Sequence, residues 1–349
     1  MKHESESVDL RRDTTTRPDR RMKDAAFAAA LGDSVYGEDP DHNTLERRAA
    51  EVLGKQAAIF LPSGTMGNLI ALLVHTGRAA EVILEQNAHI RTSETGNAAA
   101  VGGLMLRGVP GPDGIPAAED VAAAIRADDI HYPRSSLICL ETSHYRYGGI
   151  VPSLQAMRAI RELADQRGLP VHLDGARIWN AAVALDVAPS LIAGYVDSVM
   201  ASLSKGLGAP VGSVLAGSER FIAEARRYRK MLGGGMRQTG WLCAAALVAL
   251  EPDNLERLRQ DHRNARALAE GIAGLPGIEI DPARVQTNFV LATVTRAGID
   301  AAQLVRGLAE RGVLASAAGS STVRFVTCSE VNRHGIDTAI EQLRVILER

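Results

Sequence analysis

A lysine at position 205 follows a short apolar stretch and stands among small residues, in the run Ser202-Leu203-Ser204-Lys205-Gly206-Leu207-Gly208. Such a run leaves space around the amine. Burial removes hydration from a lysine and lowers its pKa, so that the free amine can attack an aldehyde. Lys205 is therefore a candidate Schiff-base lysine, although an exposed lysine in a glycine-rich loop would show the same local pattern.

An acidic side chain ends another apolar stretch, in Val171-His172-Leu173-Asp174-Gly175-Ala176-Arg177. Open parallel sheets bind ligands at the carboxyl ends of their strands. Asp174 is suited to hold a protonated pyridine nitrogen, and Arg177 offers a planar pair of donors that suits a carboxylate. A simple helix cap is the alternative role for Asp174.

A third segment, Leu61-Pro62-Ser63-Gly64-Thr65, joins an apolar stretch to a helical pattern. Backbone N–H groups and two hydroxyls would meet at the N-terminus of that helix, where the helix dipole favours an anion such as phosphate. A plain N-cap would use the same residues. In the order anion site, acid, lysine, the three segments together describe pyridoxal 5'-phosphate held by its phosphate, ring nitrogen and aldehyde.

The candidate residues of each segment stand where a strand of an α/β fold is expected to end. Short β-type runs alternate with helical patterns from about residue 45 to about residue 250, which is typical of a mostly parallel sheet covered by helices. Apolar spacing predicts helices over 65–75 and near 154–163. Strands are predicted at 57–61, 82–84, 137–140, 171–173 and 197–203.

A change of pattern at Glu251-Pro252-Asp253-Asn254 divides the chain. Beyond it we expect a charged helix over 255–275 and then a mixture of helix and strand. The predicted organisation is an N-terminal arm at 1–30, solvated because of its arginine cluster, a large cofactor-binding domain at 31–251 and a smaller α+β domain at 252–349.

Composition excludes several classes of protein. The 349 residues carry 39 basic and 41 acidic side chains, without the basic excess of a nucleic-acid-binding protein. Three widely spaced cysteines form neither a disulfide framework nor a metal-ligand pattern, so no metal is expected and a reducing cytoplasm is the predicted location. The sequence shows neither a signal peptide nor an apolar run of about 20 residues, so neither secretion nor membrane insertion is expected.

These segments resemble the L-threonine aldolases and related β-eliminating lyases, which are fold type I pyridoxal-phosphate enzymes with the architecture of aspartate aminotransferase. The resemblance covers nearly the whole chain. It rests on Asp13-Thr14, Thr16-Arg17-Pro18, Gly32-Asp33-Ser34-Val35-Tyr36-Gly37-Glu38-Asp39-Pro40, Ser63-Gly64-Thr65, Ala88-His89-Ile90, His172-Leu173-Asp174-Gly175-Ala176-Arg177, Ser204-Lys205-Gly206-Leu207-Gly208-Ala209-Pro210-Val211-Gly212 and Gly233-Gly234-Gly235-Met236-Arg237-Gln238.

The resemblance assigns roles to individual residues. It implies that Lys205 carries the cofactor, that Asp174 holds the ring nitrogen and that His89 stacks on the ring. Arg237 would reach the phosphate of a neighbouring subunit, which implies a homotetramer with shared active sites. The phosphate is expected at Ser63, Gly64 and Thr65, further cofactor contacts at Ser204 and Arg177, and the substrate at Arg177, Arg324, Arg12 and Tyr36. Tyr36 would equally suit a subunit contact.

Three positions depart from the family pattern. Arg12 stands where the family has a serine near the substrate carboxylate, Cys328 replaces a histidine, and the segment Glu141-Thr142-Ser143-His144-Tyr145 keeps its histidine but changes the residues around it. Because an arginine adds a permanent charge, we hypothesise that the substrate carries a second anionic group that pairs with Arg12. The alternative is that Arg12 turns to solvent or to a neighbouring subunit.

The function implied by the resemblance is cleavage of a threonine-like β-hydroxy-α-amino acid to glycine and an aldehyde. His89 or His144 would take the proton of the β-hydroxyl, since imidazole titrates near neutral pH. The same residues suit a β-lyase or transaldolase acting on a related, dicarboxylic amino acid, and a non-catalytic relative that binds the cofactor is a further alternative.

Overall fold

The computed structural model describes residues 7–348, so the first six residues of the predicted arm lie outside the described residues. The helices are α1 (Arg20–Phe27), α2 (Pro40–Leu53), α3 (Gly64–His75), α4 (His89–Thr92), α5 (Asn97–Ala100), α6 (Ala118–Ala124), α7 (Leu154–Arg167), α8 (Ile178–Leu185), α9 (Pro189–Ala193), α10 (Glu219–Met231), α11 (Gly240–Ala249), α12 (Pro252–Ile272), α13 (Ala301–Ala309) and α14 (Arg333–Leu347). The strands are β1 (Val8–Asp9), β2 (Ala57–Leu61), β3 (Glu81–Glu85), β4 (Met105–Val109), β5 (Ser135–Glu141), β6 (Val171–Gly175), β7 (Ser198–Ser202), β8 (Ser213–Gly217), β9 (Ile278–Glu279), β10 (Phe289–Val294), β11 (Val313–Leu314), β12 (Ser316–Ala317) and β13 (Thr322–Val326).

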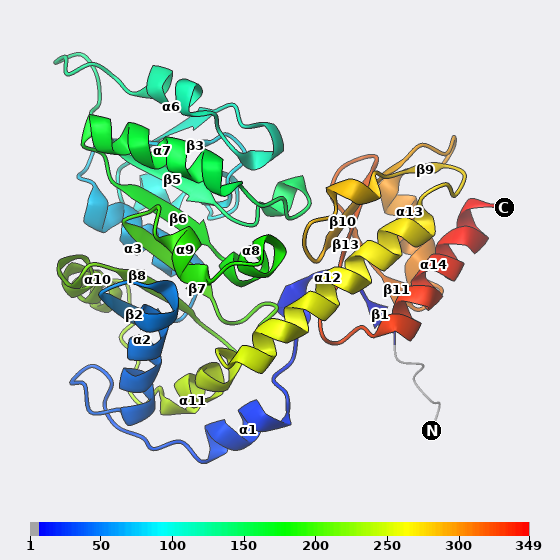
Figure 1. Cartoon of the computed structure of the whole chain (residues 1–349), viewed down its shortest axis with the longest axis horizontal. Helices are drawn as coiled ribbons and strands as arrows, with labels where there is room; N and C mark the ends of the chain where they lie inside the picture. Colours follow the sequence, from blue (N-terminus) through cyan, green and yellow to red (C-terminus); the bar gives the residue numbers. More distant parts are fainter. Residues whose placement is uncertain (1–6, 349) are drawn as a thin grey trace.

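Within residues 7–348 the largest sheet has seven strands in the order β2-β8-β7-β6-β5-β3-β4. The five strands from β7 to β4 run parallel, whereas β8 runs antiparallel to both β2 and β7. Helices connect the parallel strands, as the alternating pattern of the sequence predicts (Figure 1). The predicted α/β class with a mostly parallel sheet is therefore confirmed.

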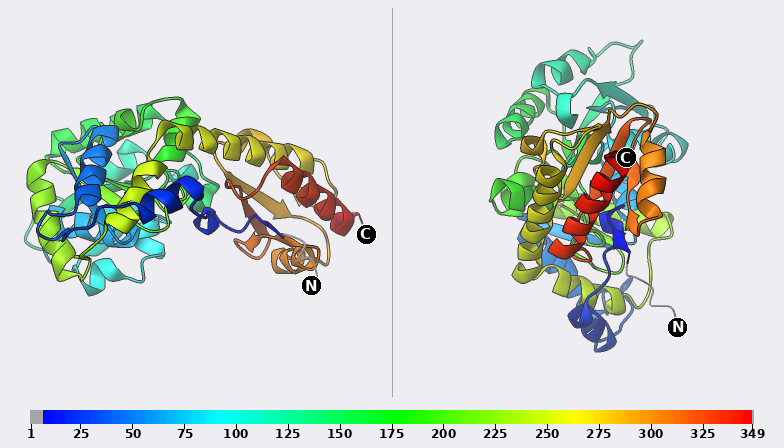
Figure 2. Two further views of the ribbon diagram at one scale, coloured as in Figure 1. Left: turned by 90° about the horizontal axis from the view of Figure 1, so that it is seen from below. Right: turned by 90° about the vertical axis from the view of Figure 1, so that its right-hand side faces the viewer.

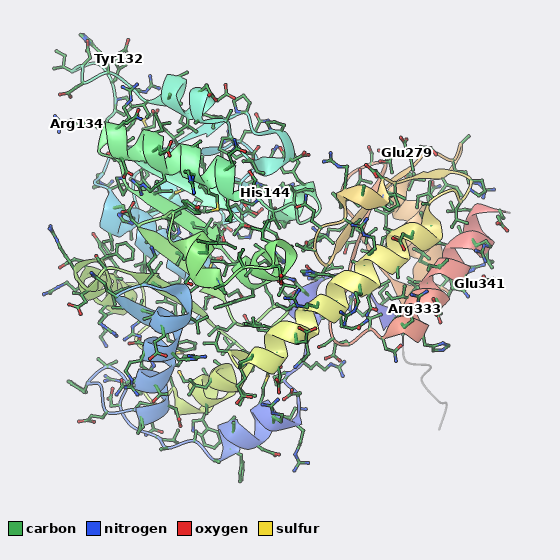
Figure 3. All side chains as sticks on the ribbon, in the orientation of Figure 1. Tyr132, Arg134, His144, Glu279, Arg333 and Glu341 are labelled. Carbon is green, nitrogen blue, oxygen red and sulfur yellow. The ribbon has the colours of Figure 1, made fainter. Side chains whose placement is uncertain are left out.

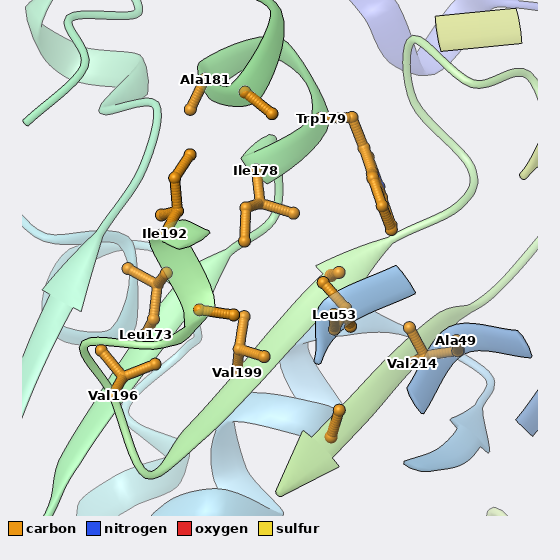
Figure 4. Packing of buried hydrophobic residues seen from close by; sticks show 14 of the residues in the cluster. Ala49, Leu53, Leu173, Ile178, Trp179, Ala181, Ile192, Val196, Val199 and Val214 are labelled. Atoms are coloured by element: carbon orange, nitrogen blue, oxygen red, sulfur yellow. The ribbon is translucent and has the colours of Figure 1, made fainter. Parts of the chain in front are cut away.

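Helices cover both faces of this sheet because its strand residues are apolar on both sides. Val199 and Ala201 pack in the cluster that includes α2, α7, α8 and α9, whereas Met200 between them packs with α3 and α10 on the opposite face. Figure 4 shows Ile178 of α8 beside Leu173 and Val199, with Trp179 of the same helix on the side toward Leu53. Two-sided burial of this kind is expected of a parallel strand.

A second core belongs to the C-terminal part of the chain. The antiparallel sheet β12-β13-β10-β9 packs with α12, α13 and α14 around residues such as Leu304, Phe325 and Leu343 (Figure 1). This is the smaller α+β unit that the sequence predicts. The exact division at residue 251 stays a prediction, although α12 begins with Pro252 at its first turn.

Two segments link the two cores. Helix α12 buries Leu258 in the large core and Leu268 in the small one, and Figure 2 shows it running from one part to the other. The N-terminal segment also crosses between them, since Leu10 packs in the small core and Met22 in the large one. From Val8 onward the predicted arm is thus held by apolar burial and by pairing of β1 with β11, which differs from the solvated arm expected from its charges.

Candidate active site

The carboxyl ends of the parallel strands bring the predicted residues to one edge of the large sheet. Asp174 lies near the end of β6 and pairs in register with Glu141 at the end of β5. His89 follows β3 by four residues, and Lys205 follows β7 by three. The edge that the sequence predicts for ligand binding is therefore the edge where these groups gather.

Lys205 lines a cavity of about 270 Å³ between the two parts of the chain. Burial lowers the pKa of its amine to about 8, and the nearby Arg177 charge acts in the same direction. The cavity is also lined by Arg12, Asp13, Thr14, His89, Ser93, Tyr145, Arg177, Phe289, Arg324 and Val326. The lysine thus has the partly deprotonated amine that attack on an aldehyde requires.

Asp174 is 2% exposed and accepts two hydrogen bonds. The Asn68 side-chain amide donates to its Oδ2 over 2.9 Å, and the Ala176 backbone N–H donates to its Oδ1 over 3.1 Å. The N-cap of the following helix, α8, is Arg177. Asp174 is therefore not that helix's cap, and its carboxylate suits a cationic ring nitrogen.

His89 stands between the cavity and a buried acid. Its Nδ1 lies 2.9 Å from Oε1 of Glu94 and 4.0 Å from Oδ2 of Asp174. Burial acts to lower the pKa of His89, but the hydrogen bond to Glu94 and the charges of Asp174, Glu94 and Glu141 outweigh it and raise that pKa. His89 can therefore exchange a proton close to neutral pH.

The wall facing Lys205 carries a buried ion pair. Nε and Nη2 of Arg177 donate to Oδ2 and Oδ1 of Asp13 over 2.7 and 2.8 Å. The guanidinium also lies over the ring of Phe289, with 4.7 Å from Cζ to the ring centroid. Two of the three nitrogens of Arg177 are thus committed to Asp13 rather than available to a substrate carboxylate.

Arg324 and Arg12 bring further positive charge to the cavity. Nε of Arg324 is buried and has no hydrogen-bond partner within the described residues. Burial and the charges of Arg177 and Arg12 lower the pKa of Arg324. An anion placed here would supply the missing acceptor, which makes Arg324 the better placed of the two predicted carboxylate anchors. Arg12 itself is exposed and lines the same cavity.

Helix α3 carries the predicted phosphate site. Oγ of Ser63 accepts a hydrogen bond from the Met66 N–H over 3.2 Å, so Ser63 is the N-cap of this helix. The first N–H groups of a helix have no partner within it and remain available to an anion. One turn later the same helix presents Asn68 to Asp174, which relates the anion site to the acid. A side chain at Gly64 would lie 3.0 Å from Met200, so glycine lets the loop approach the sheet.

Other predicted residues lie away from the Lys205 cavity. His144 is 1% exposed on the large domain (Figure 3), and its Nε2 lies 3.2 Å from Oε2 of Glu85. Tyr36 is 76% exposed, and Arg237 is on the surface with its Nη1 2.9 Å from Oδ2 of Asp33. Ser204 adjoins Lys205 and donates to the Gly212 carbonyl over 3.3 Å. Within one chain, residues 7–348 do not bring His144, Tyr36 or Arg237 to this cavity.

Sequence reasoning missed the residues that hold the acid and the histidine. Asn68 and Glu94 are both buried and contact Asp174 and His89, respectively. Atoms of His89, Glu94 and Asp174 all lie within 4.8 Å of one another, a spacing that would also suit a metal ion. The Asn68 amide donates to both carboxylates, so hydrogen bonds already join this cluster. A polar Asn68 on an apolar helical stretch was the available signal.

Comparison with known proteins agrees with this arrangement. Residues 9–295 match the family model described as beta-eliminating lyase. The chain belongs to this family. It is 45% identical over 325 residues to low-specificity L-threonine aldolase 1 of Arabidopsis thaliana, covering 92% of this chain and 90% of that protein. It is 43% identical over 343 residues to the low specificity L-threonine aldolase of Escherichia coli (strain K12), covering 98% and 100%.

The beta-eliminating lyase fold is also found among solved structures. A threonine aldolase structure from Leishmania major superimposes with a TM-score of 0.83 at 20% identity and covers 97% of this chain and 99% of that one. As a member of its family, the chain is a pyridoxal-phosphate-dependent lyase of fold type I. Among residues 7–348, no helix combines the length and apolar character needed to cross a membrane.

Proposed function

We propose that this beta-eliminating lyase is a low-specificity L-threonine aldolase, which cleaves L-threonine to glycine and acetaldehyde and accepts other β-hydroxy-α-amino acids. The relatives of 43% and 45% identity bear that name. The observation that carries the proposal is that Lys205, His89 and Arg324 line one cavity. Amine, proton acceptor and carboxylate anchor are the three groups that the reaction requires.

The buried groups of the site fit pyridoxal phosphate. Lys205 would hold its aldehyde, Asp174 its ring nitrogen, and the N-terminus of α3 with Ser63, Gly64 and Thr65 its phosphate, with Ser204 beside the lysine. When bound, the cofactor supplies an electron sink for the bond that breaks. The lowered pKa of the Lys205 amine and the burial of the Asp174 carboxylate support this fit.

The chain's own residues orient the substrate and move its proton. Arg324 binds the α-carboxylate, with the remaining Nη1 of Arg177 beside it, and so sets which bond of the α-carbon faces the electron sink. His89 accepts the proton of the β-hydroxyl as the bond between the α- and β-carbons breaks. Phe289 and Tyr145 line the same cavity and limit the access of water. Glycine and an aldehyde leave.

Arg12 supports a second candidate within the same chemistry. Arg12 lines the cavity, and among the described residues no hydrogen bond or ion pair is formed by its side chain. A β-hydroxy amino acid with a side-chain carboxylate would supply a counter-charge. A dicarboxylic substrate is therefore the alternative, with either cleavage or elimination as its reaction.

The proposed assembly is a homotetramer with active sites shared between subunits. Several large apolar side chains are exposed on or beside the packed pair α1 and α11 and on neighbouring segments of the chain: Phe27 of α1, Trp241 of α11, Leu31 and Tyr36 of the 31–36 loop, and Met231 at the end of α10. Ser34 donates to the Met236 carbonyl over 2.6 Å, which joins the Tyr36 loop to the glycine-rich segment. Patches of this kind favour subunit contacts, where Tyr36 and Arg237 would serve a neighbouring site.

For location we propose the cytoplasm, since Cys139, Cys243 and Cys328 are buried free thiols.

A substrate comparison tests the proposed function. The holoenzyme is incubated with β-hydroxy amino acids and, in parallel, with amino acids that carry a β leaving group such as chloride. We expect glycine and an aldehyde from the first set, with the higher kcat/KM. Pyruvate formed from the second set at a higher kcat/KM would instead identify a β-lyase.

A further inference from the structure

Asn68 places one amide group between two buried carboxylates. Its Nδ2 lies 2.8 Å from Oε1 of Glu94 and 2.9 Å from Oδ2 of Asp174. Asn68, Glu94 and Asp174 are 0%, 3% and 2% exposed. Since a carboxylate only accepts hydrogen bonds, the NH₂ group and not the oxygen of Asn68 must face both acids.

The orientation of Asn68 is fixed from its other side as well. Its Oδ1 lies 3.2 Å from Nε2 of His172, which must donate. Burial, with a smaller effect of His75, lowers the pKa of His172 to about 3, so that ring is neutral and its Nδ1 accepts from the Ser198 hydroxyl over 2.9 Å. Oγ of Ser198 accepts in turn from Nε2 of His75 over 2.8 Å. In this series of hydrogen bonds, each N–H or O–H group has one acceptor.

The contact with Glu94 in turn determines which ring nitrogen of His89 carries a proton. Its Oε1 accepts from Asn68 and also lies 2.9 Å from Nδ1 of His89, so Nδ1 must carry a proton. The nitrogen left to act on a ligand is Nε2 of the ring that lines the Lys205 cavity. A carboxylate that fixes the proton of a catalytic histidine in this way also stabilises the imidazolium that forms when the ring accepts a second proton.

We propose that Glu94, held by Asn68, is a positioning residue that keeps the proton of His89 on Nδ1 and reserves Nε2 to accept the proton of the substrate β-hydroxyl. This inference rests on the proposed function. In the step, the O–H bond breaks and an N–H bond forms at Nε2, the electron pair left on the oxygen becomes the second bond of the aldehyde C=O, and the bond between the α- and β-carbons breaks. The cofactor, when bound, would supply the electron sink for the pair of that carbon–carbon bond. The Glu94 carboxylate lies beside the ring and balances the imidazolium charge.

The two hydrogen bonds of Asn68 connect Asp174, assigned to the cofactor ring, with Glu94, which orients the proton acceptor. One amide of Asn68 holds both the acid assigned to the cofactor ring and the acid that orients the proton acceptor. A displacement of α3 would therefore disturb both together. The charged and titratable groups nearest His89 are Glu94, Asp174, Glu141 and Tyr145. The same cavity is also lined by Lys205, Arg177, Asp13, Arg12 and Arg324.

Nitrogen chemical shifts of isotope-labelled histidine test this assignment in the holoenzyme without any turnover. His89→Asn identifies the signals of His89. The wild-type protein should show a proton on Nδ1 and a bare Nε2 above the pKa of the ring. In Glu94→Gln the titration midpoint of His89 should fall by about one pH unit or more, a tenfold change in proton affinity. The acid limb of the kcat/KM profile should move to lower pH by the same amount.

Glu81→Gln is the matched control, since Glu81 is 2% exposed on the same sheet but pairs with Arg126 at the opposite end of β3. It should leave the His89 titration unchanged. A wild-type proton on Nε2, or an unchanged midpoint in Glu94→Gln, would overturn the inference. The wild-type spectrum decides even where the variant does not fold. Failure of the wild-type enzyme to release glycine would overturn the proposed function instead, while the tautomer would still be read from the spectrum.

Discussion

Asp13 and Arg177 are 164 residues apart in sequence and form a two-point ion pair in the wall of the Lys205 cavity, with distances of 2.7 and 2.8 Å. Burial acts to raise the pKa of Asp13, but the charge and hydrogen bonds of Arg177 outweigh it and keep that pKa below its usual value. The pair anchors the N-terminal segment at the active site. It also explains why Arg324, whose Nε has no hydrogen-bond partner among residues 7–348, is the better anchor for a substrate carboxylate.

Removing one partner of this pair should destabilise the protein strongly. Asp13→Asn leaves Arg177 buried without a counter-charge, and we expect the free energy of unfolding to fall by about 3 kcal/mol. Denaturant unfolding measures the change. Asp24→Asn, which removes an exposed partner of Arg20, should cost under about 1 kcal/mol. Equal costs for the two variants would show that the Asp13 pair contributes no more than a surface contact.

Lys205 should react with pyridoxal phosphate at a lower pH than an ordinary lysine does. With the pKa lowered to about 8, the reactive amine appears as pH rises through about 8 rather than through the usual range near 10.5. The rate at which the apoprotein takes up the cofactor, followed by absorbance, should show this midpoint. Borohydride reduction and peptide mapping should place the label on Lys205, and a label on another lysine would refute the assignment.

Asp174→Asn should bind the cofactor but lose roughly a thousandfold in kcat, because a neutral amide does not stabilise a protonated ring nitrogen. Steady-state kinetics and the cofactor absorbance are measured on the same sample. Asp186→Asn changes an exposed acid at the end of α8 and should retain full activity. Near-normal turnover of Asp174→Asn would remove Asp174 from the mechanism.

Arg12→Ser distinguishes the two substrate classes. If Arg12 pairs with a second carboxylate, the variant should lose about tenfold in kcat/KM for a dicarboxylic β-hydroxy amino acid and little for threonine. The neighbouring Arg11 is held by Asp9 and does not line the cavity, so Arg11→Ser should affect neither substrate. Equal losses on both substrates in Arg12→Ser would show that Arg12 does not recognise a second acid.

The strands and the residues that follow them were predictable from sequence because both depend on local pattern. The strand predicted at 57–61 coincides with β2, and those that precede Asp174 and Lys205 differ from β6 and β7 by at most two residues at either end. Because parallel strands end at the same edge of a sheet, the clustering of Lys205, Asp174 and His89 at that edge was also predictable. Strand β8 was missed, and its antiparallel direction is set by its neighbours in the sheet.

Other features depend on packing that the sequence pattern does not contain. Asn68 lies on an apolar stretch, and only the seating of α3 on the sheet brings its amide to Asp174. The direction of His144 depends on the turn after β5, which presents its Nε2 to Glu85. Tyr36 and Arg237 lie on the surface of a single chain, so their proposed roles depend on a second copy.

The products formed from L-threonine test the central claim most directly. Purified holoenzyme is incubated with L-threonine, and glycine, acetaldehyde, 2-oxobutanoate and ammonia are all quantified, with Lys205→Ala as the control. We predict one glycine and one acetaldehyde for each threonine consumed, and loss of both in Lys205→Ala. Formation of 2-oxobutanoate and ammonia in their place, or an unchanged rate in Lys205→Ala, would contradict the account.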